Sequence, residues 1–189
     1  MKDILKRFQH VWGDDPAGLL DKYHYQPELT KKLDALHAEE LTEQTLLEII
    51  LWKVNRYPQL DPDLMDELRT LGNLQPQQHR QAEALLRKLL SSPGIRLPMA
   101  STILRFLNPE VFQIIDDRVF RVLMPGQRRY PDKPASGGSL VSYLNNSVET
   151  YFSYLDAMHE VTSEKLPFHL ADRILYQLDI ELGNRIGDR

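Results

Sequence analysis

The chain of 189 residues contains no cysteine. Disulfides, thiolate zinc sites and cysteine-ligated iron–sulfur clusters are therefore excluded. The six histidines are scattered, without a spacing typical of a metal site. No apolar run is long enough to cross a membrane, and the N-terminus has no apolar core of the kind found in secretion signals. We therefore expect a cytoplasmic protein without a membrane partner or a metal site.

A strong overall charge is also missing, because the formal net charge is only −4. The charge is nevertheless unevenly distributed. Between His79 and Arg129 lie nine basic and four acidic residues, which gives that span +5 and leaves −9 for the rest. A basic face on an acidic body suits a local contact with a polyanion. Solvated helix faces produce the same counts, and charge alone favours that simpler interpretation.

No stretch alternates polar and apolar residues as a strand does, and the apolar spacing is helical along most of the chain. Thr42 is a typical helix cap, and Asp61 followed by Pro62 is a strong helix start. Further helices are expected after Pro76, from Pro98, after Asp116 or Asp117, and over about 140–159 and 167–184. The sequence predicts an all-α domain over residues 1–189, built from two intimate helical subdomains.

A tight turn joins two amphipathic helices within about residues 79–107, and its sequence is Ser92-Pro93-Gly94-Ile95-Arg96. Gly94 permits the turn conformation, and backbone N–H groups at the following helix start can bind a DNA phosphate without reading sequence. Ordinary αα-hairpins share these features. The turn alone is therefore weak evidence for DNA binding, which Arg96 and Arg105 strengthen modestly.

The apolar residues Phe112, Ile114 and Ile115 precede Asp116. Aspartate is a favoured helix cap, so a purely structural role is a clear alternative. An apolar setting raises the pKa of a carboxyl group unless hydrogen bonds or nearby arginines compensate. The segment is therefore also a candidate for a functional carboxylate.

These segments together resemble the helix-hairpin-helix DNA glycosylases of base excision repair, the HhH-GPD superfamily. Members of this family have a Leu-Pro-Gly-Val-Gly-like hairpin, an alanine shortly after it, and a Val-Asp-x-x-Val-x-Arg-Val run. The chain offers Pro93-Gly94-Ile95, then Ala100, then the run from Ile115 to Val122. Weaker similarity extends over about 41–183, and the specific motifs lie in the central thirty residues.

The resemblance implies that Asp116 is the catalytic residue, which stabilises positive charge on the deoxyribose and activates water. Pro98 stands where bifunctional members carry a lysine, and a proline cannot form the Schiff base of a lyase reaction. Arg96 replaces the second glycine of the hairpin, which we expect to alter the turn. The family pattern needs no redox cofactor or catalytic metal, and it allows a monovalent cation at the hairpin carbonyls.

The DNA-contacting residues implied in this way lie in the hairpin and in the basic segments after it: Pro93, Gly94, Ile95, Arg96, Arg118, Arg121, Arg128 and Arg129. The candidates for a base pocket or wedge are the following: Trp52, Asn55, Tyr57 and Tyr130. A core position is the favoured interpretation of Trp52. Tyr130 belongs to a mobile basic loop, about 124–138, and we expect it to be exposed.

The sequence therefore predicts a monomeric, monofunctional DNA N-glycosylase that flips a modified or damaged base out of double-stranded DNA. One alternative is a noncatalytic helix-hairpin-helix DNA-binding protein, which the substituted glycine favours and Asp116 opposes. Others are a glycosylase for modified bases of foreign DNA, and a helical interaction protein with a coincidental Pro-Gly turn. The sequence does not specify the base.

Overall fold

The computed structural model describes residues 4–54, 58, 60–127, 129–134 and 139–185. Within these ranges the chain is all-α, with an isolated β-bridge between Ser163 and Leu166 and no strand. The helical class predicted from the apolar spacing is thus confirmed. The chain forms two compact units, residues 1–57 and 58–189. No described helix is both long and apolar enough to span a bilayer.

The first unit consists of short helices and 3₁₀ turns: α1 (Ile4–Arg7), α2 (Gln9–Trp12), η1 (Pro16–Lys22), α3 (Pro27–Asp34), η2 (Ala38–Glu40) and α4 (Glu43–Lys53). Thr42 caps α4 as predicted, because its side chain accepts a hydrogen bond from the Thr45 N–H. Lys32 of α3 pairs with the nearly buried Glu48 of α4 at 2.6 Å. This ion pair ties the two longest helices of the unit together.

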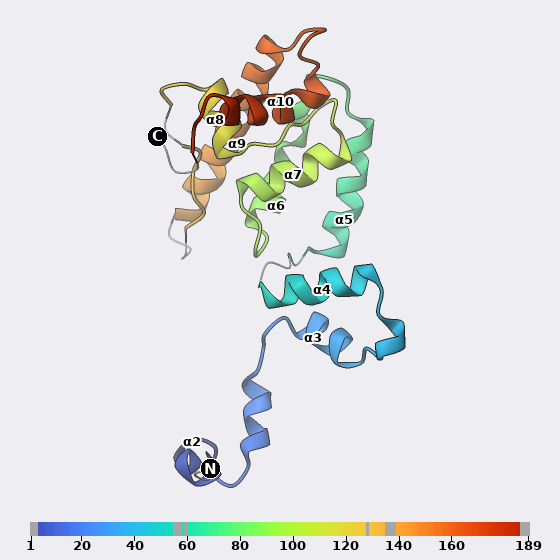
Figure 1. Ribbon diagram of the computed structural model, residues 1–189, viewed down its shortest axis with the longest axis vertical. Coiled ribbons are helices and arrows are strands. Elements are labelled where there is room, and N and C mark those ends of the chain that lie inside the picture. The colour runs from blue at the N-terminus through green and yellow to red at the C-terminus, as the bar shows by residue number, and fades with distance from the viewer. Residues whose placement is uncertain (1–3, 55–57, 59, 128, 135–138, 186–189) are drawn as a thin grey trace. The chain divides into compact units, whose positions relative to one another are not determined.

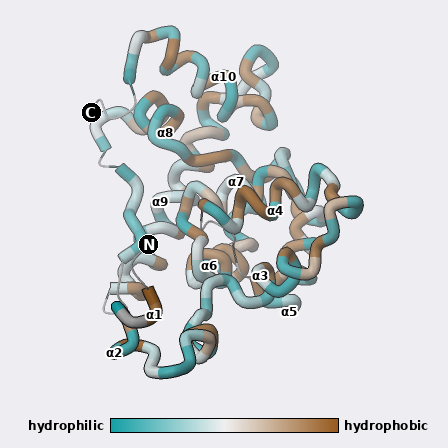
Figure 2. Tube along the Cα trace, turned by 60° about the horizontal axis from the view of Figure 1, so that its bottom comes forward, coloured by the Kyte–Doolittle hydropathy of each residue, from teal (hydrophilic) through white to brown (hydrophobic). Residues whose placement is uncertain are grey.

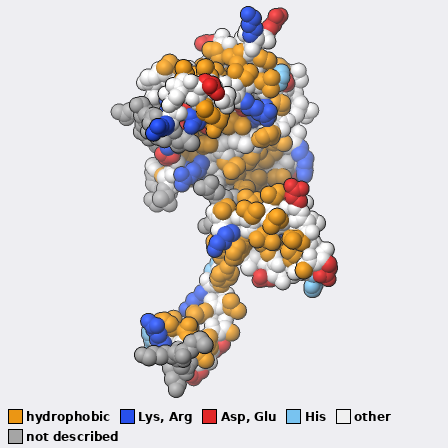
Figure 3. Space-filling view, viewed as in Figure 1, with side chains coloured by type: hydrophobic (Ala, Val, Ile, Leu, Met, Phe, Trp, Pro, Cys, Tyr) orange, Lys and Arg blue, Asp and Glu red, His pale blue; other side chains and the backbone are white. Residues whose placement is uncertain are grey.

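Apolar side chains gather on the surface that α3 and α4 form, as the space-filling view shows (Figure 3). Leu46, Leu47 and Ile50 of α4, and Val54 directly after it, each leave about half of their surface exposed. Helix α4 is therefore apolar on more than one face, which is unusual for a helix in contact with water.

The second unit contains the remaining elements: α5 (Pro62–Arg69), η3 (Thr70–Asn73), η4 (His79–Ala82), α6 (Glu83–Ser91), α7 (Leu97–Leu107), α8 (Asp117–Leu123), α9 (Leu140–Val161) and α10 (Phe168–Glu181) (Figure 1). Asp61 caps α5 as predicted, since its side chain accepts a hydrogen bond from the Asp63 N–H at 2.8 Å. The longer helix expected after Pro76 begins later. Gln77 has a φ of 69°, which a right-handed helix cannot accommodate, so a 3₁₀ turn precedes α6.

The core of this unit lies between α6, α7 and α9. Helix α6 contacts α5 and α9, while α8 contacts α9 and α10. The tube coloured by hydropathy shows that hydrophobic and hydrophilic residues are interspersed along the helices (Figure 2). The completely buried side chains include Leu86, Leu89, Leu90, Ile95, Leu97, Leu104, Phe112, Ile115, Tyr154 and Leu155. The hairpin and the segment before α8 are thus part of the same core.

Candidate functional site

Asp116 caps α8 from the position immediately before the helix. Its Oδ1 accepts hydrogen bonds from the backbone N–H groups of Arg118 and Val119, both at 2.9 Å. The side chain is half-buried, and no described residue donates a hydrogen bond to its other oxygen, Oδ2. The carboxylate is therefore fixed through one oxygen and leaves the second available.

The surroundings of Asp116 disfavour its negative charge. Burial raises the pKa of this carboxyl group above 3.8, and the nearby charges of Asp117 and Asp172 raise it further. The two backbone hydrogen bonds act in the opposite direction because they favour the ionised form. Burial is the largest of these effects. A half-exposed carboxylate with a perturbed pKa is a candidate functional group, although structural networks also produce such shifts.

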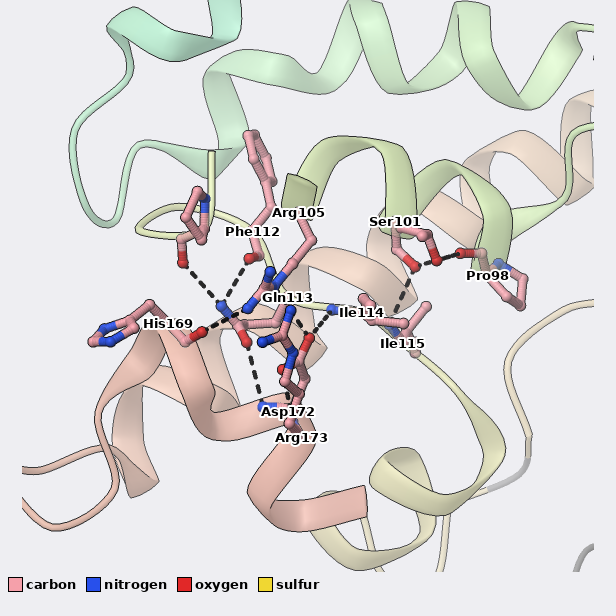
Figure 4. Close-up of polar contacts among 12 residues, drawn as sticks. Pro98, Ser101, Arg105, Phe112, Gln113, Ile114, Ile115, His169, Asp172 and Arg173 are labelled. Carbon is pink, nitrogen blue, oxygen red and sulfur yellow. Dashed lines mark hydrogen bonds and ion pairs between the residues drawn. The ribbon is translucent and has the colours of Figure 1, made fainter. Parts of the chain in front are cut away.

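Residues 109–115 carry the chain from α7 to α8, first as a turn and then without regular secondary structure, and buried polar side chains hold this segment in place (Figure 4). Gln113 is completely buried, and its Oε1 accepts a hydrogen bond from the backbone N–H of Asp172 on α10. The Asp172 carboxylate in turn accepts a hydrogen bond from the Ile114 N–H at 3.2 Å. Arg105 of α7 lies 3.6 Å from the same carboxylate. Helix α10 thus fixes the segment directly, and Arg105 joins α10 to α7.

Two tyrosines of α9 complete this network. Tyr151 donates a hydrogen bond to the Gln113 carbonyl at 2.9 Å, and Tyr154 donates one to the Ile114 carbonyl at 2.6 Å. Burial raises the pKa of both hydroxyls well above the ordinary value, so they remain neutral donors. Consecutive peptide groups before Asp116 are therefore held by side chains.

Ser101 connects this segment to the first turns of α7. The serine is completely buried, and its Oγ donates a hydrogen bond to the Pro98 carbonyl at 2.8 Å. The same oxygen accepts a hydrogen bond from the Ile115 N–H at 3.1 Å. The residue next to Asp116 is thereby attached to the helix that begins at the hairpin.

The hairpin between α6 and α7 places only some of its predicted DNA-binding residues at the surface. Gly94 has a φ of 79°, which explains the need for glycine there. Pro93, Gly94 and Arg96 are exposed, whereas the side chain of Ile95 is completely buried. Only the backbone of Ile95 could meet a ligand. Arg96 has a φ of −115°, in the extended region, so the turn needs no glycine at that position.

Arg118 and Arg121 are engaged within the protein. Both contact Asp179 of α10, Arg118 with Nη1 at 2.9 Å and Arg121 with Nη2 at 2.7 Å. Asp179 is completely buried. The hydrogen bond from Arg121 is the largest cause that lowers its pKa to about 2, and hydrogen bonds from Asn184 and Arg118 act in the same direction. The two arginines thus tie α8 to α10, a role that requires no nucleic acid.

Of the two arginines in the basic loop, Arg128 lies outside the described residues. Arg129 is exposed, and its Nε donates a hydrogen bond to Asp117 Oδ1 at 2.6 Å. Its guanidinium group also lies 5.0 Å from the centre of the Tyr130 ring. The described part of this loop is therefore attached to α8.

Of the four candidates for base recognition, the structure describes Trp52 and Tyr130. Trp52 belongs to the first unit, where it is half-buried and its Nε1 donates a hydrogen bond to Thr30. Asn55 and Tyr57 lie outside the described residues. The expectation that Tyr130 is exposed is wrong, because only 6% of it is accessible. Its ring packs edge-on against Phe120, and burial raises the pKa of its hydroxyl to about 12.

Several residues of this region were not predicted from the sequence: Ser101, Gln113, Lys133, Tyr154 and Asp172. Gln113 and Asp172 each carried a usable signal, since each is a polar residue at an otherwise apolar position. Ser101 and Lys133 carried none, because the bond from Ile115 to Ser101 and the three bonds of Lys133 join residues distant in sequence. No group of acidic or histidine side chains that could hold a metal ion occurs among the described residues.

Comparison of the chain with family models, curated proteins and solved structures finds no match.

Proposed function

We propose that this protein is a monofunctional DNA N-glycosylase of the helix-hairpin-helix type, with Asp116 as its catalytic residue. The observation that carries the proposal is the hydrogen bond between the Ile115 N–H and Ser101 Oγ. It connects the helix that follows the hairpin to the residue preceding a half-buried carboxylate. A phosphate-binding turn and a reactive carboxylate would then act on the same stretch of DNA.

The chemistry assigned to Asp116 follows from its one available oxygen. A modified or damaged nucleotide is flipped out of the duplex, and its base leaves with the electron pair of the N-glycosidic bond. Ionised Asp116 stabilises the positive charge that develops on the deoxyribose. A water molecule then bonds to the anomeric carbon, and the carboxylate accepts its proton. The departed base takes up a proton, and release of the proton from Asp116 restores the carboxylate. The products are a free base and an abasic site.

The hairpin is assigned to hold the DNA backbone. Gly94 lets the chain approach a phosphate closely, and the exposed Arg96 adds a positive charge beside it. Arg118 and Arg121 contribute indirectly, because their contacts with Asp179 fix the helix that Asp116 caps. These contacts of the hairpin involve the DNA backbone and not the base edges. Other groups must therefore select the base.

A panel of duplex oligonucleotides tests the proposal. The duplexes carry oxidised purines, alkylated purines, mismatches or bulky modified pyrimidines, and strand breaks are measured after alkali treatment. We expect alkali-labile sites in at least one modified duplex and none in the unmodified control. Binding that weakens steeply with salt, without any base release, would support the noncatalytic DNA-binding alternative. The absence of any DNA binding would support a helical interaction protein.

A further inference from the structure

Three backbone carbonyls of the hairpin region converge on one ammonium group. Lys133 Nζ donates hydrogen bonds to Leu90 O at 2.6 Å, Ser92 O at 2.8 Å and Ile95 O at 3.1 Å. These acceptors belong to the last turn of α6 and to the turn that follows it. A lysine ammonium has three donors and no acceptor, so this arrangement uses its full hydrogen-bonding capacity.

The position of these carbonyls explains why a cation is favoured there. The last carbonyls of a helix have no partner within the helix and carry its negative partial charge. Leu90 is the penultimate residue of α6, and Ser92 directly follows the helix. Several inward-facing carbonyl oxygens form the kind of ligand set that binds a bare monovalent cation elsewhere in proteins.

Lys133 is bound by backbone carbonyls, as a cation inside a protein is. It is half-buried, and no described aspartate or glutamate forms an ion pair with it. Burial and the nearby charge of Arg96 lower the pKa of its ammonium group. The three carbonyls oppose that effect, because only the charged form can donate to all of them. The carbonyls, rather than a carboxylate, balance this charge.

We propose that Lys133 replaces a bound monovalent cation at the hairpin: its ammonium group fills a carbonyl-lined site that would otherwise take K⁺ or Na⁺. The hairpin of this chain is thereby independent of the monovalent cation in solution. Lys133 also ties the loop between α8 and α9 to the turn between α6 and α7. The inference refines the hairpin's part in the proposed function, yet its test requires no DNA.

The test removes the ammonium group and asks whether a metal ion can take its place. Lys133→Ala leaves space at the three carbonyls. Lys165→Ala is the matched control, because Lys165 is exposed in the same unit and makes no hydrogen bond or ion pair with a described residue. Thermal midpoints are measured at one ionic strength in potassium, sodium, lithium and tetramethylammonium chloride. Tetramethylammonium is too large to enter the site.

We expect the unaltered protein and Lys165→Ala to have midpoints that do not depend on the cation. Lys133→Ala should melt roughly 5 °C lower in tetramethylammonium chloride and regain most of that loss in potassium or sodium chloride. The same dependence in the unaltered protein would overturn the inference. So would a Lys133→Ala midpoint that is equal in all four salts.

A second variant covers the case in which Lys133→Ala does not fold. Lys133→Gln keeps an amide donor for one carbonyl, and its midpoint should rise in potassium relative to tetramethylammonium chloride, though less than for alanine. A midpoint that stays constant overturns the inference here too. Because these measurements involve no nucleic acid, a negative result would not contradict the proposal of base excision. A protein that excises no base can likewise still show the cation effect.

Discussion

The Ile115 N–H donates a hydrogen bond to Ser101 Oγ over 3.1 Å, and Ser101 is completely buried. This contact joins the second turn of α7 to the residue before Asp116. Since Tyr151 and Tyr154 hold the two preceding carbonyls, the backbone reaches Asp116 with little freedom. Such fixed positioning is what a group that must meet a developing charge requires.

Replacement of Ser101 by alanine should separate this positioning from DNA binding. The buried Ile115 N–H would lose its acceptor, which costs about 1–3 kcal/mol of stability. A small displacement of Asp116 should slow base excision by roughly 10- to 100-fold, with duplex affinity unchanged. Single-turnover excision and duplex titration provide the two readouts.

Thr102→Ala is the matched control for Ser101→Ala. Thr102 Oγ1 also donates to the Pro98 carbonyl at 2.8 Å, and its side chain makes no hydrogen bond to residues 109–115. We expect Thr102→Ala to excise at the normal rate. An equal loss of excision rate in the two variants would mean that the first turn of α7 matters only for folding.

The pH dependence of excision should report the environment of Asp116. The reaction uses the ionised carboxylate, so the rate should rise with pH through the pKa of this group. Burial places that pKa above the ordinary value of 3.8. The fall of the excision rate on the acidic side, the acidic limb, should therefore occur at a higher pH than for an ordinary aspartate. Single-turnover rates between pH 4 and 8 measure the limb. A rate that stays constant down to pH 4 would contradict the assignment.

The same raised pKa has a consequence for stability. A carboxyl whose pKa is higher in the folded state favours folding while it is protonated, and this contribution is lost as pH rises through the folded-state pKa. Asp116→Asn keeps a good helix cap without the charge. The stability of this variant relative to the unaltered protein should therefore increase with pH over that interval, as measured by denaturant unfolding.

Asp179 should show the opposite dependence. Its pKa is lowered to about 2, chiefly by Arg121. The stability that it contributes is present above the unfolded-state pKa of about 4 and is lost as pH falls toward 2. Asp179→Asn should cost about 2 kcal/mol or more at pH 7, because two arginines lose their buried partner. Urea unfolding measures the difference in unfolding free energy between Asp179→Asn and the unaltered protein. A difference that stays the same at acidic pH would contradict this account.

No covalent intermediate with abasic DNA is expected. Pro98 offers no amine, and the nearest lysine upstream, Lys88, pairs with Glu67 at 2.5 Å. Incubation with an abasic duplex and borohydride should yield no trapped protein–DNA adduct. Strand cleavage should need added alkali. A trapped adduct would show that an amine of the chain performs lyase chemistry.

The sequence predicts the helices well because their signals are local. The caps at Thr42 and Asp61 satisfy N–H groups within three residues, and both occur as expected. The sequence leaves the next helix start open between Asp116 and Asp117, and the structure shows that Asp116 is the cap. The turn at Gly94 likewise depends on a single backbone conformation. Local chemistry of this kind can be recognised without tertiary structure.

The contacts between distant segments could not be predicted in this way. Arg118 and Arg121 have the same sequence signature whether they meet phosphate or Asp179, and only the packing of α8 on α10 distinguishes the two. Tyr130 follows two arginines in a proline-containing loop, yet Phe120 provides an apolar surface that buries it. Lys133 is one more basic residue until the three carbonyls are seen around it.

The most direct test of the central claim compares the unaltered protein with Asp116→Asn on the modified duplex that responds best in the oligonucleotide panel. Asparagine preserves the helix cap, so folding and duplex affinity should change little. Loss of the carboxylate should reduce single-turnover base release by at least about 100-fold. Base release by Asp116→Asn at the rate of the unaltered protein would contradict the assignment of Asp116 as the catalytic residue.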